Sequence, residues 1–220
     1  GIHQMRVAFR RLRSGLKIFQ PLVPREASAE QVENIRWLNG FLGPARDWDV
    51  FLDEGMAVVF SHFPRKRGLI LFRSKAEDIR QFHHRALREA LAEPRYSLLL
   101  QRFADWLERR AWREVCHDKQ SERLADPVRA FAIPLLERDH RRVVKQGDLF
   151  AELSVEQRHR LRIRIKQLRY AEDFFNSLYE TATVRRYLDA LSKLQDCLGV
   201  MNDISVARRL LDEAGLRSVS

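Results

Sequence analysis

Two rows of basic residues with matching spacing carry the chemistry that this sequence is able to perform. Each row begins with a histidine and continues with arginine or lysine every three or four residues. On a helix, which turns about 100° per residue, this spacing places the members of the first row within about 80° of one another. Each row therefore forms one basic face of a helix. The rows are His3, Arg6, Arg10, Arg13 and Lys17, and His159, Arg162, Lys166 and Arg169.

A row of cations on one helix face is suited to a chain of phosphates. Guanidinium groups donate paired hydrogen bonds to phosphate oxygens and stay charged at physiological pH. Successive helical turns rise about 5 Å, so a row can follow successive phosphates. No acidic residue occurs between residues 1 and 20 or between Gln157 and Tyr170, and uncompensated cations at this spacing repel one another by about 0.2–0.5 kcal/mol per pair. The rows therefore predict a linear polyanionic ligand, with the histidines as further donors.

Helices must position these rows. Almost every stretch between prolines and glycines has helical periodicity, and alternating strand patterns are scarce, which predicts an all-α chain. Apolar residues such as Leu161, Ile165 and Leu168 run beside the basic rows and predict a buried stripe next to each basic face. Ser28 and Ser154, each followed three residues later by glutamine, predict capping boxes. The expected helices cover about 2–20, 28–43, 47–62, 69–92, 95–117, 128–146, 155–179, 182–198 and 203–214.

Glycines and acidic residues are expected to mark helix boundaries. Gly43 and Gly199 are suited to end the helices that precede them. Asp47, Asp49 and Asp203 follow shortly after these glycines, where carboxylates cap the free N–H groups of a new helix. Capping is therefore the expected role of these acids, with the orientation of neighbouring arginines as the alternative.

An internal repeat divides the chain into two halves. The segment HQMRVAFRRLR, from His3, recurs as HRLRIRIKQLR from His159, and LGPARDWDV, from Leu42, recurs as LGVMNDISV from Leu198. Both pairs are separated by 156 residues (159 minus 3, and 198 minus 42). Two motifs at one offset indicate structural copies, which cover about 1–120 and 127–220. The charged stretch 118–127 is the expected linker.

These motifs, together with PRYSLLL from Pro94, resemble the CHAD family, the conserved histidine α-helical domain, over essentially the whole chain. The resemblance implies a single CHAD-like domain, residues 1–220, made of two pseudo-symmetric antiparallel helical bundles with a basic central cavity. It implies that this cavity binds inorganic polyphosphate without catalysis and without a cofactor. It also implies association with polyphosphate granules, and frequent fusion to CYTH-type triphosphate-processing domains, of which the sequence shows no trace.

By position, the resemblance implies that both basic rows line the cavity. The halves differ at two points, because Lys17 is matched by Asp173 and Arg46 is matched by Asn202, which predicts unequal contributions. No catalytic or metal-ligating residue is predicted. The predicted polyphosphate-binding residues are His3, Arg6, Arg10, Arg13, Lys17, Arg46, His159, Arg162, Lys166 and Arg169.

Composition leaves two other functions open. The net charge of +10 favours anionic partners, so backbone-directed nucleic-acid binding is an alternative, although no motif for sequence-specific reading occurs. A metal-dependent phosphohydrolase would use the histidines with Asp47, Asp49 and Asp203, but the basic rows contain no clustered carboxylates. Two cysteines without the spacing of a metal site favour a reducing cytoplasm. Apolar runs are far shorter than the roughly 20 residues of a membrane span, so no membrane partner is predicted.

Charge reversal within the rows tests their role. Changing Arg6, Arg10, Arg162 and Lys166 together to glutamate is expected to abolish the binding of long polyphosphate, because it places negative charge along the proposed path of the ligand. Circular dichroism is expected to show an unchanged helix content. Loss of helicity in this variant would instead assign the four residues a structural role.

Overall fold

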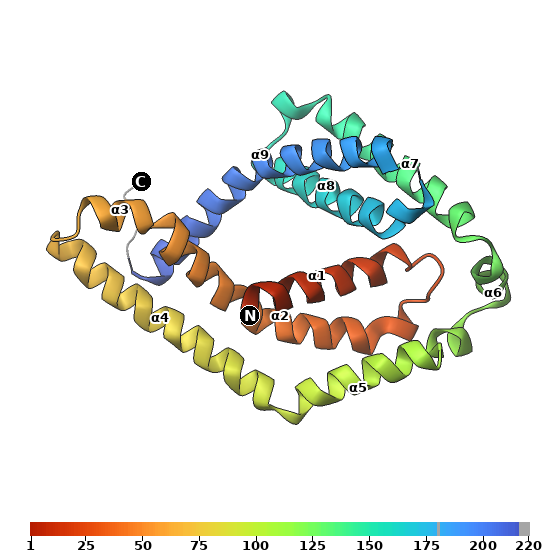
Figure 1. Cartoon of the computed structure of the whole chain (residues 1–220), viewed down its shortest axis with the longest axis horizontal. Helices are drawn as coiled ribbons and strands as arrows, with labels where there is room; N and C mark the ends of the chain where they lie inside the picture. Colours follow the sequence, from red (N-terminus) through yellow and green to blue (C-terminus); the bar gives the residue numbers. More distant parts are fainter. Residues whose placement is uncertain (180, 216–220) are drawn as a thin grey trace. The chain divides into compact units, whose positions relative to one another are not determined.

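The computed structural model describes residues 1–179 and 181–215, apart from the side chains of residues 181–184 and 200–202. In this part of the chain the regular elements are helices and no strand occurs, so the predicted all-α class is confirmed. Figure 1 shows the helices in chain order. Their bounds are α1 Ile2–Ile18, α2 Ala29–Val50, α3 Ala57–His62, α4 Arg67–Ala92, α5 Pro94–Glu108, α6 Asp118–Ala125, α7 Val128–Gly147, α8 Val155–Phe175 and α9 Thr181–Glu213.

The chain forms two compact units, each built from segments that are far apart in the sequence. Unit 1 comprises residues 1–10, residues 26–112 and the chain from Ile204 onward. Unit 2 comprises residues 11–25 and 113–203. Helices α1 and α9 therefore each contribute to both units. The repeat halves and the central cavity stay predictions.

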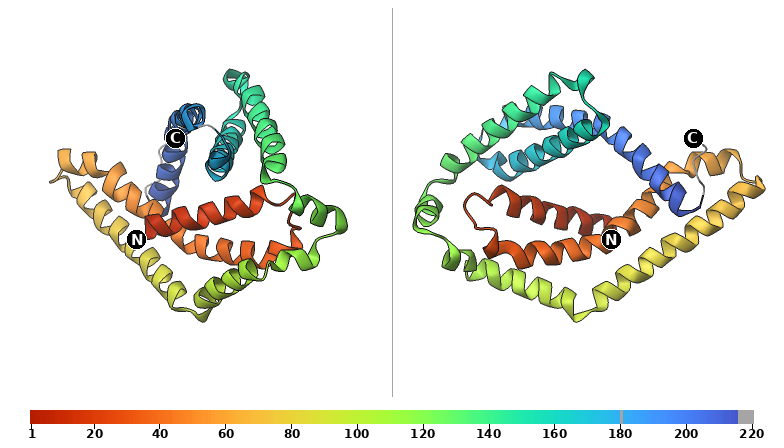
Figure 2. Two further views of the ribbon diagram at one scale, coloured as in Figure 1. Left: turned by 45° about the vertical axis from the view of Figure 1, so that its right-hand side comes forward. Right: turned by 180° about the vertical axis from the view of Figure 1, so that it is seen from behind.

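The core of unit 1 holds the C-terminal part of α2. Helices α2 and α4 lie side by side (Figures 1 and 2), and Trp48, Ala76 and Leu210 are fully buried where they meet the end of α9. The ring of Phe51 meets those of Trp48 and Phe72 edge to face, with centroids 5.7 and 6.4 Å away. Burial and edge-to-face contacts of large aromatic rings stabilise such a core. The segment that carries Asp47 and Asp49 is thereby fixed.

The prediction that a helix ends near Gly43 is wrong, because α2 continues to Val50 with Pro44 inside it. Leu42, Ala45 and Trp48 are fully buried, so the apolar face of the helix continues across the Gly-Pro pair. Burial of these side chains offsets the roughly 3 kcal/mol that a proline costs in a helix interior.

Helix α9 likewise runs through Gly199 without a break. As a result Asp47, Asp49 and Asp203 lie inside helices, and the predicted role of these acids as caps at helix starts is wrong.

Two further boundaries differ from expectation for local reasons. Helix α5 ends at Glu108 because Arg110 takes a left-handed conformation, with φ 51°, which terminates a helix. The chain then turns so that the rings of Trp112 and Trp106 lie 4.8 Å apart between centroids. The expected linker 118–127 contains α6, whose first turn is fixed by the backbone N–H of His117 donating to the side chain of Gln120 at 3.2 Å.

In unit 2 the predicted apolar stripe of α8 is buried. Helices α7 and α8 lie side by side, and Leu161, Ile165, Leu168 and Phe175 are each at most 3% exposed. These side chains meet apolar residues of α7, α9 and the end of α1. Helix α8 therefore turns its apolar stripe inward and leaves the adjoining basic face at the edge of the core.

The start of α8 is capped as the sequence predicts. The Oγ atom of Ser154 accepts a hydrogen bond from the backbone N–H of Gln157 at 3.3 Å, and the Oε1 atom of Gln157 accepts one from the N–H of Ser154 at 2.7 Å. The side chain of Ser28 does not cap α2 in this way, so only the second predicted capping box is confirmed. A capping box satisfies two N–H groups that the first turn leaves free.

A buried carboxyl group lies in the core of unit 2. Glu172 of α8 is 9% exposed, and burial raises its pKa. Burial, followed by the nearby Glu172 charge, raises the pKa of Tyr187 to about 12. The hydroxyl of Tyr187 lies 2.6 Å from the Nδ1 atom of His140. Ionisation of Glu172 therefore lowers the stability of the folded state of this unit.

Replacing Glu172 by glutamine is expected to stabilise the protein at neutral pH by on the order of 1 kcal/mol. Because the pKa of Glu172 is raised in the folded state, the native protein loses stability as pH rises above about 4, where the unfolded carboxyl ionises. The Glu172→Gln variant lacks this loss, so the two proteins are expected to be equally stable below that pH. Urea unfolding at several pH values measures the difference, with the exposed Glu152→Gln as a control that shows no such trend.

Candidate functional site

The basic row of α8 lies beside the buried stripe, as the sequence predicts. His159 is exposed, whereas Arg162, Lys166 and Arg169 are half-buried. The Nε atom of Arg169 donates to Oε1 of Gln195 at 3.0 Å, and the guanidinium lies over the ring of Tyr170 at 5.1 Å. These contacts orient Arg169 without neutralising it.

Arg162 differs from Arg169 in its hydrogen bonding. Its Nε atom is buried and has no hydrogen-bond partner in the part of the chain that the structure describes. In that same part, neither Arg162 nor Arg169 forms an ion pair with a carboxylate. A half-buried guanidinium of this kind is suited to receive an anion from solution, because hydrogen bonds between charged groups are strengthened in partly desolvated surroundings.

The basic row of α1 belongs partly to each unit. His3, Arg6 and Arg10 lie in unit 1, whereas Arg13 and Lys17 lie in unit 2. His3, Arg13 and Lys17 are exposed, and Arg6 and Arg10 are half-buried. The row is thus on one helix, as predicted, but its members meet different surroundings.

Asp47 joins three helices of unit 1 through two arginines. Its Oδ1 atom accepts a hydrogen bond from Nη1 of Arg6 on α1 at 2.8 Å, and its Oδ2 atom accepts one from Nη2 of Arg209 on α9 at 2.8 Å. Arg6 also donates to the carbonyl oxygen of Gly43 at 3.3 Å. The alternative role considered for this acid, the orientation of neighbouring arginines, is therefore correct for Asp47.

Arg209 is a residue that the sequence analysis missed. It lies outside both repeated motifs, and its only local signal is Glu213 one helical turn later, which pairs with it at 3.7 Å. Its contact with Asp47 spans 162 residues, so only folding brings the two together.

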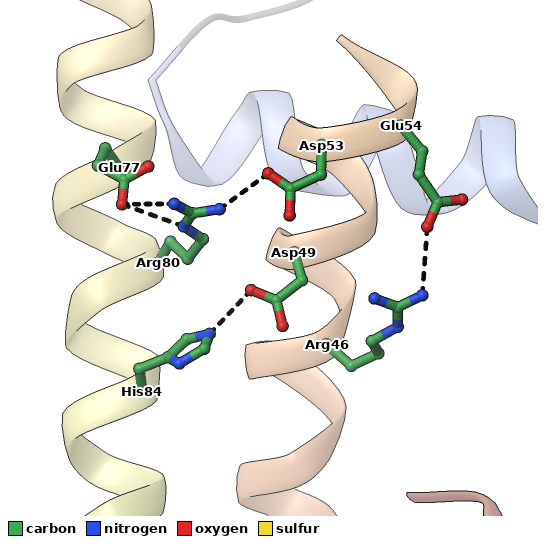
Figure 3. Close-up of polar contacts among 7 residues, drawn as sticks. All are labelled: Arg46, Asp49, Asp53, Glu54, Glu77, Arg80 and His84. Atoms are coloured by element: carbon green, nitrogen blue, oxygen red, sulfur yellow. Dashed lines mark hydrogen bonds and ion pairs between the residues drawn. The ribbon is translucent and has the colours of Figure 1, made fainter. Parts of the chain in front are cut away.

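Three basic side chains of α2 and α4, those of Arg46, Arg80 and His84, also contact carboxylates (Figure 3). Nε2 of His84 lies 2.8 Å from Oδ1 of Asp49, and Arg80 binds both Asp53, at 3.0 Å, and Glu77, at 2.8 Å. Arg80 and His84 reach from α4 towards the acids of the α2 segment, which holds the two helices in register. These contacts lie within unit 1.

Arg46, predicted as a ligand of polyphosphate, pairs with Glu54 at 3.2 Å in Figure 3. This pair is exposed on the Glu54 side, so an anionic ligand can compete for Arg46. Asn202, its expected counterpart, has a side chain outside the described residues. Asp173, the counterpart of Lys17, pairs with Arg11 of the same unit at 3.1 Å.

The acids that a phosphohydrolase would need are engaged elsewhere. Asp47 is held by two arginines, and Asp49 contacts His84. Among the described residues, no group of three or more histidine, cysteine or acidic side chains is arranged as a metal site. In the same part of the chain, no helix has the length and apolar character of a membrane span.

Known proteins with the same pattern identify the family. The sequence profile of the CHAD domain matches residues 1–212. The chain belongs to the CHAD family. The crystal structure of the CHAD domain from the plant Ricinus communis has 34% sequence identity to this CHAD domain, with a TM-score of 0.77 over 96% of this chain and 68% of that one. No sequence among curated proteins matches.

The predicted resemblance and the helical architecture of this CHAD domain are both confirmed by these matches. The ten predicted polyphosphate-binding residues stay predictions, since neither match assigns a role to a residue.

Asp47→Asn is expected to lower the free energy of unfolding by about 1–2 kcal/mol, because it removes the charge that the half-buried Arg6 and the exposed Arg209 share. Glu54→Gln is the matched control, since it removes one exposed ion pair and is expected to change stability by less than about 0.5 kcal/mol. Urea unfolding measures both. Equal effects of the two substitutions would show that Asp47 is only another surface charge.

Proposed function

We propose that this CHAD domain binds inorganic polyphosphate and does not hydrolyse it. The observation that carries the proposal is the state of the α8 row, where Arg162 and Arg169 are half-buried and form no ion pair with a carboxylate in the described part of the chain. Internal acids offset the charge of Arg6 and Arg46 in unit 1. The α8 row is therefore expected to attract an anionic ligand more strongly than these two arginines do. The proposed binding residues remain the ten predicted from the sequence.

Polyphosphate suits these rows better than nucleic acid. Of the aromatic residues of α8, Tyr170 and Phe175 are 5% and 3% exposed and Phe174 is 38% exposed, so at most one of them offers part of a face on which a base could stack. Proteins that bind single strands without sequence preference use such stacking together with cations. A ligand made only of phosphates needs the cations alone.

Binding without turnover is supported by the engagement of the acids. Asp47 and Asp49 each hold a basic side chain of unit 1, whereas phosphoanhydride hydrolysis requires a metal ion or a positioned base close to the phosphate. We place the protein in the cytoplasm, on polyphosphate granules, with triphosphate-processing domains as partners. This placement follows the family resemblance and belongs to the proposal.

A titration series tests the proposed function. Medium-chain polyphosphate is titrated against duplex and single-stranded oligonucleotides of equal phosphate count, and phosphate release is assayed at the end of each titration. Polyphosphate is expected to bind most tightly and to remain intact. Affinity is expected to fall steeply with salt, because binding releases condensed counterions, and to rise with chain length, because a long chain engages more than one segment of the surface.

Paired variants of α8 localise the site. Arg162→Gln with Arg169→Gln is expected to weaken polyphosphate binding at least about 10-fold, because two charge-assisted contacts are lost. Arg160→Gln with Arg164→Gln removes the same charge from exposed positions of the same helix and is expected to have a much smaller effect. Equal losses would reduce the row to a general basic surface, equal affinity for oligonucleotides would favour a nucleic-acid binder, and released phosphate would favour an enzyme.

A further inference from the structure

The turn between α3 and α4 exposes apolar side chains that no other part of unit 1 covers. Seven large hydrophobic side chains of the described residues are more than half exposed, and four of them, Val58, Phe63, Ile70 and Leu71, lie within 14 residues of one another. Single exposed apolar residues are common on protein surfaces, but a cluster of them marks an interaction site. Residues 55–76, the segment that contains them, are named the α3–α4 tip.

The tip carries positive charge without acids. Residues 55–76 contain Arg65, Lys66, Arg67, Arg73 and Lys75 and no aspartate or glutamate. Arg65, Lys66 and Arg67 follow one another at the start of α4 and are exposed, where the positive end of the helix dipole disfavours cations. An external anion is the natural compensation for this arrangement.

The acids that border the tip are already occupied. Figure 3 shows that Asp53 and Glu77 both bind Arg80 and that Glu54 binds Arg46. Lys66 and Arg73 lie over phenylalanine rings of the tip, at 5.9 and 5.2 Å from the centroids of Phe63 and Phe60. The cations of the tip therefore stand beside apolar side chains, with no carboxylate of the described chain bound to Arg65, Lys66, Arg67 or Arg73.

The α3–α4 tip contains a hollow. In all three views the turn lies at the end of unit 1 where the chain passes from α3 into α4 (Figures 1 and 2). A hollow of about 530 Å³ opens there, with walls that include Phe60, Phe63, Leu69 and Ile70. The apolar part of this wall is suited to hydrocarbon, and Arg73, Ser74 and Glu77 form its polar part.

We propose that the α3–α4 tip docks on an anionic lipid surface, with Phe63, Ile70 and Leu71 at the acyl-chain boundary and Arg65, Lys66 and Arg67 among the headgroups. Apolar residues flanked by cations are the pattern of interfacial membrane binding, and each cation near such a surface strengthens binding by electrostatic attraction. This inference goes beyond the proposed binding of polyphosphate. It concerns attachment to the surface of a membrane, which the lack of a spanning helix among the described residues does not address. It differs from the sequence-based expectation of no membrane partner.

Two other anionic partners fit the tip less well. Polyphosphate would satisfy the cations but has no apolar part to cover Phe63, Ile70 and Leu71. An acidic amphipathic helix would need one continuous groove, whereas the exposed side chains are spread over α3, the turn and α4. A fluid lipid surface accommodates such an irregular arrangement.

Co-sedimentation with vesicles tests the proposal, using the whole chain. The protein is expected to partition onto phosphatidylcholine vesicles that contain phosphatidylserine and not onto vesicles of phosphatidylcholine alone. Replacing Arg65, Lys66 and Arg67 by glutamine is expected to reduce this partitioning on the order of 100-fold. Phe63→Ser with Leu71→Ser is expected to reduce it at least about 10-fold, because the inserted apolar area is lost.

Matched controls remove the same groups elsewhere. Arg109→Gln, Arg113→Gln and Arg160→Gln together remove three exposed cations, and Leu100→Ser with Leu107→Ser removes two exposed apolar residues of α5. Both controls are expected to keep the partitioning of the unchanged protein. Equal losses in the controls, or no preference for anionic vesicles, would overturn the proposal.

Two further outcomes would reassign the surface. If the tip charge variant loses polyphosphate affinity more than its control does and keeps its vesicle binding, the tip is part of the polyphosphate surface. If the protein ignores vesicles and binds an acidic amphipathic helical peptide through the tip, the partner is a protein. Either result would overturn lipid docking.

Discussion

Helix α8 has to bury one side while keeping cations at the edge of the buried region. Leu161, Ile165 and Leu168 are at most 2% exposed, and this burial fixes the rotation of the helix about its axis. Because Arg162 and Arg169 each directly follow a stripe residue, the same rotation leaves them half-buried. The hydrophobic contact that stabilises unit 2 therefore also sets how much water each guanidinium loses, and hence how strongly it attracts a phosphate.

Arg6 of α1 and Arg169 of α8 are held by different kinds of partner. In unit 1, Asp47 holds Arg6 and Arg209, and both oxygens of its carboxylate are used. A polyanion that binds Arg6 must compete with this internal partner, whereas Arg169 in unit 2 is held by a neutral amide, that of Gln195. An arginine oriented by a neutral group keeps its charge for a ligand, while one held by a carboxylate contributes more to the fold. The unequal contributions inferred from Lys17 and Asp173 thus have a counterpart in the pairing of the cations.

Helix boundaries show where local signals prevail and where they do not. The capping box of Ser154 and Gln157 forms as expected because both partners lie within one turn and need no other part of the chain. Gly43 and Pro44 are equally clear local signals, yet α2 passes through them because Ala45 and Trp48 are fully buried. A tertiary core outweighs a local preference of a few kcal/mol when the side chains beyond the break have a place in it.

The sequence by itself determined the helical class, the family, the apolar stripe of α8 and the rows of cations beside it, because each follows from the spacing of residues along one helix. Tertiary structure decided which cations have internal partners. Arg209 reaches Asp47 across 162 residues, and His84 reaches Asp49 across 35, and no periodicity reports such pairs. The reason is physical: periodicity records which side of a helix a residue occupies, whereas an ion pair requires two helices to be brought together, and burial of Trp48, Ala76 and Leu210 does this only in the folded protein.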